Sequence, residues 1–192
     1  MIRHVRVALS VLTMTTLSAC AITARSPDSN HLPSVLSALH EAQRTDRTGS
    51  VDGFLALYPA GAPVPLHDWP VMLLPATPEL EAAIAAFHQT YLAQGPAPLS
   101  PAQLQQARQL LRDAAERVRR VEPRSLIQTA KTGQEEPRFQ FLSVPEGRWL
   151  LIAELTAKRS ALLWAVPVII RPGQQVHQSL NEGSVWVEGL LP

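Results

Sequence analysis

The chain has 192 residues, of which 46% are hydrophobic and 17% charged, and its 17 Lys and Arg against 16 Asp and Glu leave a formal net charge of +1. This length is sufficient for one domain with a sizeable core. The near-neutral charge supplies no field that would steer nucleic acid toward the protein, so we expect no nucleic-acid partner. A single cysteine excludes an intrachain disulfide.

The first twenty residues are typical of a secretory signal peptide. Arg3 and Arg6 form a positive segment, and residues 7–17 form an apolar run shorter than the ~20 residues that a membrane-spanning helix needs. The run ends in Leu17-Ser18-Ala19-Cys20, which resembles a bacterial lipobox. This resemblance implies that residues 1–19 are removed and that the thiol of Cys20 is acylated. The alternative is a chance cysteine at the end of an ordinary signal peptide.

Acylation of Cys20 would anchor the chain to a membrane, because two or more acyl chains together hold a protein there. Ala21 and Ile22 follow the cysteine in place of the Asp that marks inner-membrane retention. The resemblance therefore implies a lipid-anchored protein on the periplasmic face of the outer membrane. Removal of residues 1–19 would leave 15 basic and 16 acidic side chains. We interpret 20–50 as the lipidated cysteine, a polar tether over 21–32 and a short helix over 33–44.

From residue 51 the sequence favours β-structure, interrupted by one helical block. Apolar runs over 54–58 and 71–74 have the length of strands and are bounded by Pro and Gly. Thr77-Pro78 then reads as an N-cap and first helical residue, followed by apolar residues at helical spacing. Ser100-Pro101-Ala102-Gln103 predicts a capping box that opens a second, longer helix. We expect the two helices to form an antiparallel hairpin inserted at 78–122.

The remainder of the chain predicts further strands separated by Pro- and Gly-containing turns. They are expected over 125–130, 138–142, 148–155, 162–170 and 174–180, with a possible last strand over 184–188. Short strands at this spacing indicate a β-sandwich, and we assign the whole of 51–192 to one such domain with the helical insertion.

The segment "RFQFLSVPEGRWLLIAE" resembles the core of the carboxypeptidase regulatory-like domain, a transthyretin-like antiparallel β-sandwich. The likeness rests on the F-x-F strand at Phe139 and Phe141, the turn at Pro145 and Gly147, and Trp149, Ala153 and Glu154 in the returning strand. It extends over about 51–77 and 125–180. The chain departs from the family in "TAKTGQEEPRF", which lacks the Asp-rich turn before the F-x-F strand. The resemblance implies a fold and assigns no activity.

Motifs of catalysis and metal binding are weak in this sequence. There is no G-x-S-x-G elbow, P-loop or dinucleotide fingerprint, and the only thiol is the one expected to carry lipid. His67-Asp68 in a Pro-rich loop is better interpreted as a solvated pair. Glu81 and His88 lie two turns apart on one predicted helix and could share a metal. A zinc site, however, requires three or four protein ligands. We expect no enzyme activity, no metal and no cofactor.

Two further patterns have both a structural and a functional interpretation. The basic run "RDAAERVRRVEPR" could contact anionic headgroups, but Asp113–Arg117 and Glu116–Arg120 are favourably ordered pairs that predict a solvated helix face. Four tryptophans could form a platform for sugars, or they could belong to the core; they are Trp69, Trp149, Trp164 and Trp186.

The preferred hypothesis is a non-catalytic protein-interaction or scaffold module in an envelope assembly. About 45 residues are devoted to helices that a sandwich does not require, and we nominate Gln105, Arg112 and Arg119 along the longer helix as partner-binding residues. The competing structural interpretation is that the helices only cover one face of the sheet. The competing functional hypothesis is a carbohydrate-binding module for peptidoglycan or an envelope glycan.

Overall fold

The computed structural model describes residues 31–58, 64–95, 97–122 and 126–192. Cys20 and the expected signal peptide lie outside these residues, so lipidation and processing stay predictions. Among the described residues, no helix is both long enough and apolar enough to cross a membrane.

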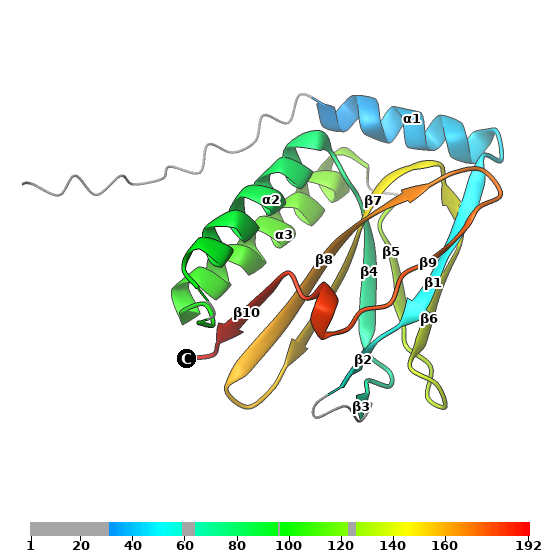
Figure 1. Ribbon diagram of the computed structural model, residues 1–192. Coiled ribbons are helices and arrows are strands. Elements are labelled where there is room, and N and C mark those ends of the chain that lie inside the picture. Colours follow the sequence, from blue (N-terminus) through cyan, green and yellow to red (C-terminus); the bar gives the residue numbers. More distant parts are fainter. Residues whose placement is uncertain (1–30, 59–63, 96, 123–125) are drawn as a thin grey trace, which may run out of the picture.

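Two sheets face one another and form the predicted β-sandwich (Figure 1). The five-stranded sheet has the order β10 (Val187–Leu190), β8 (Ser160–Ile170), β7 (Gly147–Thr156), β4 (Pro70–Pro75) and β5 (Gln128–Lys131). The three-stranded sheet has the order β6 (Arg138–Pro145), β1 (Thr48–Phe54) and β9 (Gln175–His177). A small hairpin, β2 (Ala56–Leu57) with β3 (Val64–Pro65), extends from the end of β1.

The core between the sheets follows from the alternation of apolar residues along the strands. Val51 of β1 and Phe139 and Phe141 of β6 are buried, as are Leu73 of β4 and Trp164 of β8. In β7, all five residues from Trp149 to Ala153 are buried, in contrast to the alternating pattern of β6. A run of this kind means that the sheet is covered on both faces.

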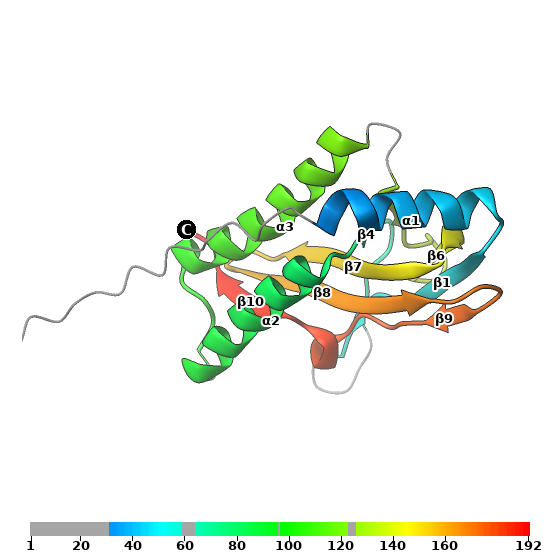
Figure 2. The ribbon, with the colours of Figure 1, turned by 90° about the horizontal axis from the view of Figure 1, so that it is seen from above.

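The second cover of the five-stranded sheet consists of α2 (Pro78–Ala93) and α3 (Pro101–Val121). Both predicted caps are confirmed: the Thr77 hydroxyl accepts a hydrogen bond from the Leu80 amide at 3.2 Å, and Ser100 and Gln103 form a capping box. Figure 1 and Figure 2 show that the two helices run next to one another in opposite directions along the sheet, with a clear separation between them. Each is held mainly by the strands beneath it: Leu104 of α3 packs on Gly189, and the Trp186 indole donates to the Ile84 carbonyl of α2 at 3.2 Å.

The predicted short helix is also confirmed, as α1 (Leu32–Arg44), which lies across one end of the sandwich (Figure 1). Its buried stripe consists of Leu32, Leu36, Leu39 and Ala42. Leu39 packs so closely on Gly147 that a Cβ there would lie 2.5 Å from the Leu39 side chain, and the φ of +155° at Gly147 also favours glycine. His40 lies 2.8 Å from a carboxylate oxygen of Glu122 and links α1 to the end of α3, and His31 pairs with Glu79 of α2.

The largest differences from the predicted strands involve the predictions over 54–58, 174–180 and 184–188. The first of them begins in the chain before residue 54. β1 begins at Thr48, although its sequence "TGSVDGF" is too polar and glycine-rich to resemble a strand. The glycines are required because β1 passes very close to the segment after β8: a Cβ on Gly53 would lie 1.9 Å from the Gln178 carbonyl oxygen. The predicted strand over 54–58 is therefore split between the end of β1 and β2.

The predicted strand over 174–180 is shorter than expected and joins a different sheet. The turn at Pro172-Gly173 carries the chain away from β8, and β9 then pairs with β1 in parallel. This parallel pair departs from a purely antiparallel sandwich. The possible last strand, predicted over 184–188, is present as β10 but begins three residues later, because the short 3-10 helix Glu182–Ser184 and the two residues after it come first.

We predict that Leu104→Ala lowers the free energy of unfolding by about 2–5 kcal/mol, because Leu104 is 1% exposed and fastens α3 to β10. Leu92→Ala is the matched control, since Leu92 of α2 is 56% exposed. Urea denaturation of both variants measures the difference. Equal, small losses for the two variants would show that Leu104 does not fasten α3 to β10.

We also predict an acid-sensitive contribution from the β1–β9 pair. Burial acts to raise the pKa of Asp52, but hydrogen bonds from His177 at 3.0 Å and Gln175 at 3.0 Å outweigh it, so the pKa of this carboxyl is lowered. A carboxyl with a lowered folded-state pKa stabilises the fold above its unfolded pKa of about 3.9, and this contribution is lost as pH falls through the folded value. Asp52→Asn should therefore reduce stability at pH 7 and flatten its decline below about pH 4 in urea titrations. If the stability of Asp52→Asn fell below about pH 4 as steeply as that of the wild type, the proposed contribution of Asp52 would be wrong.

Candidate functional site

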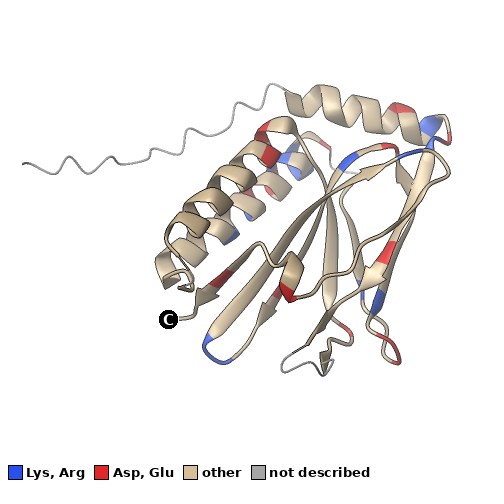
Figure 3. Ribbon diagram, in the orientation of Figure 1, with Lys and Arg blue, Asp and Glu red and all other residues tan. Residues whose placement is uncertain are grey.

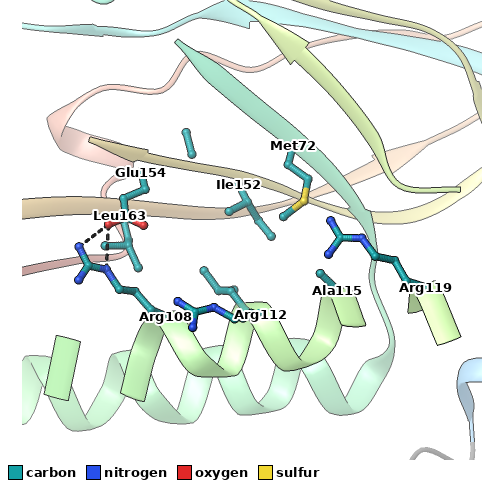
Figure 4. Close-up of a pocket in the computed structure, with 10 residues that line it drawn as sticks. Met72, Arg108, Arg112, Ala115, Arg119, Ile152, Glu154 and Leu163 are labelled. Atoms are coloured by element: carbon teal, nitrogen blue, oxygen red, sulfur yellow. Dashed lines mark hydrogen bonds and ion pairs between the residues drawn. The ribbon is translucent and has the colours of Figure 1, made fainter. Parts of the chain in front are cut away.

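A groove of about 260 Å³ runs between α3 and the outer face of the five-stranded sheet (Figure 4). One wall is the flank of α3, and the floor comes from β4, β7 and β8. The lining residues are Met72, Arg108, Leu111, Arg112, Ala115, Arg119, Ile152, Ala153, Glu154 and Leu163.

The groove results from two periodicities that meet at one place. Along α3, the residues at positions 108, 111, 112, 115 and 119 recur at three- and four-residue steps and so lie on one flank of the helix. On the sheet, Met72 is directly opposite Ile152, and Glu154 is directly opposite Leu163, so all four side chains lie on the face that the helices cover. The floor is apolar because this face is largely core.

The charges in the groove are unevenly paired. Arg108 Nε donates to the Glu154 carboxylate at 2.8 Å, and both side chains are partly buried. Arg112 and Arg119 are exposed, and neither has a hydrogen-bond or ion-pair partner within the described part of the chain. The groove therefore carries two uncompensated positive charges beside an apolar floor.

Most of the other Lys and Arg side chains in the described segments have a partner. Arg148 forms a two-point ion pair with Glu81, and hydrogen bonding to that carboxylate raises the pKa of Arg148. Lys131 pairs with Asp68, and Arg138 lies over the Phe54 ring at 4.4 Å. In the described segments, the remaining cations without a partner are Lys158, Arg159 and Arg171, which lie in the turns that flank β8. Figure 3 shows the resulting distribution, with charge along α3 and very little on α2 beyond its first turn.

The structure brings two of the three nominated binding residues to this groove. Arg112 and Arg119 line it, whereas Gln105 is exposed one turn before Arg108 on α3 and is outside the lining. Sequence reasoning missed Arg108 and Glu154. The spacing of Arg108 to Arg112 and Arg119 would have placed all three on one flank of a helix, but nothing local indicates that Glu154 lies opposite.

The weaker sequence candidates have structural roles. Glu81 is engaged by Arg148, and His88 stacks on Tyr91 with ring centroids 6.2 Å apart. In the described ranges, no group of three His, Cys, Asp or Glu side chains could hold a metal ion. His67 lies 3.1 Å from the Gly133 carbonyl, and Asp68 accepts from Lys131 at 3.1 Å, so this pair fastens a loop to β5. Glu116 and Arg120 form the expected ion pair, while Arg117 Nε donates to the Asp113 carbonyl oxygen.

The tryptophans belong mainly to the core. Trp149 and Trp164 are fully buried, and Trp186 is 3% exposed. Trp69 is half-buried and donates its indole N–H to the backbone carbonyl of Glu154 at 2.6 Å. These four residues therefore form no exposed aromatic platform.

No protein-family model matches this chain, and no curated protein does. Among solved structures, the chain is similar to a "putative carbohydrate binding protein" from Pseudomonas aeruginosa, with 22% identity and a TM-score of 0.38. The match covers 70% of this chain and 89% of that one. At this level of similarity the match assigns no function.

Proposed function

We propose that this protein is a lipid-anchored module of the bacterial outer membrane, facing the periplasm, that binds a protein partner in an envelope assembly through the groove along α3. The observation that supports this proposal is the pair of exposed, unpartnered arginines, Arg112 and Arg119, beside an apolar floor. Guanidinium groups at the rim of an apolar surface are typical of protein interfaces, where arginine is enriched.

The groove favours binding over catalysis. Its ionisable groups are three arginines and Glu154, and that carboxylate is held by Arg108. A general acid or base would need a free group whose pKa is near the working pH, and arginine stays protonated. A surface that attracts and positions an anionic partner needs only fixed positive charge.

The helices were interpreted either as a partner-binding surface or as a cover for the sheet. The two interpretations apply to different faces of α3. Leu104, Ala107 and Ala114 belong to the buried stripe and cover the sheet. The flank with Arg112 and Arg119 faces outward along the groove. Deleting 78–122 would therefore uncover core residues such as Ile152, and a test of binding needs substitutions on the exposed flank alone.

The anchor is the other half of the proposal. Cys20 and His31 are separated by eleven positions, and a chain of that length reaches at most about 36–40 Å when fully extended. This reach is comparable to the size of the domain itself, so an anchored domain could present the groove to partners in the membrane or beside it.

We expect photoreactive residues at Gln105, Arg112 and Arg119 to crosslink to one common protein in cells. Gln105 is the most informative position, because its replacement leaves both arginines in place. The matched control is a photoreactive residue at Arg171, which is exposed in the turn after β8. Mass spectrometry should identify the same partner from all three positions on α3 and not from the control. No crosslink from α3, together with capture of soluble glycan strands by the protein, would instead favour the carbohydrate alternative.

We expect Cys20→Ser to abolish incorporation of a labelled fatty acid and to release the protein from the membrane fraction, because the thiol is the expected site of acylation. Fractionation and labelling of the wild type and the variant provide the comparison. A Cys20→Ser variant that stayed in the outer membrane would contradict the proposed anchor.

A further inference from the structure

We propose that the groove recognises an amphipathic helix of the partner that carries two carboxylates about two helical turns apart, with large apolar side chains between them. This inference rests on the proposed function and specifies the chemistry of the partner. It is carried by the spacing of the unpaired arginines, by what lies between them and by the ion pair at one end of the groove.

The spacing of the charges matches two anionic groups. Arg112 and Arg119 are seven residues apart on α3, which corresponds to about 10.5 Å along the helix axis. A carboxylate that meets one guanidinium group in a two-point, fork-like geometry uses both of its oxygens there. Two acidic residues at positions i and i+7 of a facing helix repeat the same spacing, so each can meet one arginine.

The surface between the arginines is apolar. Leu111 and Ala115 are buried in the wall, and Met72 and Ile152 lie in the floor below them (Figure 4). A facing helix with acidic residues at i and i+7 presents positions i+3 and i+4 between them on the same side. Leucine at those positions would enter the groove while the helix lies across its mouth, as in other helix-in-groove interactions.

The third arginine sets where the acidic pair can bind. Arg108 lies one turn before Arg112, and its charge is neutralised by Glu154. An acidic group placed at that end would meet the Glu154 carboxylate, which repels it. The Arg108–Glu154 pair therefore restricts the favourable register to Arg112 and Arg119, in the manner of a repulsive element in specific recognition. The same reasoning predicts a gain of affinity when Glu154 loses its charge, because Arg108 then becomes free.

The probe is a synthetic, fluorescein-labelled 16-residue helix with Glu at i and i+7 and Leu at i+3 and i+4. Its matched controls are the same peptide with both Glu replaced by Gln, and a peptide with the two Glu three residues apart. Fluorescence anisotropy with the soluble domain should show saturable binding of the first peptide, weakened about tenfold or more in both controls. Binding should weaken further as salt is raised, because the charges at the rim are screened.

The protein variants are surface substitutions, and circular dichroism checks that each stays folded. Arg112→Glu and Arg119→Glu should each weaken binding about tenfold or more, and Arg171→Glu should leave it unchanged. A peptide with Lys in place of both Glu should bind the Arg112→Glu, Arg119→Glu double variant and not the wild type. Glu154→Gln should tighten binding of the Glu peptide severalfold.

Three outcomes would overturn the inference. They are binding of the Glu peptide that the double variant leaves unchanged, equal binding of the Gln peptide, and no peptide binding combined with arginine-dependent binding to phosphatidylglycerol vesicles, which would identify a lipid surface as the occupant. If in-cell crosslinks from Gln105 persist in any of these cases, the partner-binding function stands and only its chemistry is wrong. If those crosslinks are absent, the function itself fails, whatever the peptide does.

Discussion

The five-stranded sheet must be covered on both faces, and the rest of the structure depends on this requirement. The uninterrupted buried run from Trp149 to Ala153 in β7 has apolar side chains on both sides of the strand. One side is satisfied by the three-stranded sheet and the other by α2 and α3. Two short sheets alone would leave Leu150 and Ile152 in water, at a cost of about 1.5–3 kcal/mol for each large apolar side chain. The helices are thus an integral layer of the fold.

This requirement also explains where the groove lies. α3 crosses the sheet diagonally, so that its first turn packs on β10 while its later turns pass over β7 and β4 (Figure 2). On the side of the groove, Leu111 and Ala115 border the buried stripe of α3. The next residues around the helix are the three arginines. A helix that serves as cover on one face consequently presents a cationic flank directly beside a floor that belongs to the core. Apolar floor and positive rim are both by-products of a single packing arrangement.

Sequence patterns predicted the helices more accurately than the strand pairing, for physical reasons. The caps at Thr77 and Ser100 are local hydrogen bonds between residues three apart, so the sequence alone contains them. β1 is set by close backbone approach to Gln174 and Gln178, which are distant in sequence, and no local pattern indicates such a contact. The placement of β9 beside β1 likewise depends on the route of the chain between sheets.

In the candidate site, too, the local features could be predicted from the sequence and the long-range contacts could not. Arg112 and Arg119 share a helix flank by spacing alone, and that much was expected. Their lack of partners, and the neutralisation of Arg108 by Glu154 across 46 positions, depend on how the helix lies on the sheet. The tryptophans could not be placed from the sequence, because a tryptophan in or beside a strand has the same local pattern whether it faces the core or water. Trp149, Trp164 and Trp186 are all buried.

The position of α1 has a mechanical consequence. Any tension that enters the described domain from its N-terminal side is borne first by this helix, which contacts the rest of the domain through its apolar stripe and the His40–Glu122 pair, with the His31–Glu79 pair just before it. Strands in a sheet resist shear through several backbone hydrogen bonds loaded together, whereas a docked helix can peel away one contact at a time. If the N-terminal side were pulled, α1 would detach from the domain before either sheet came apart. The sandwich and the groove would stay folded.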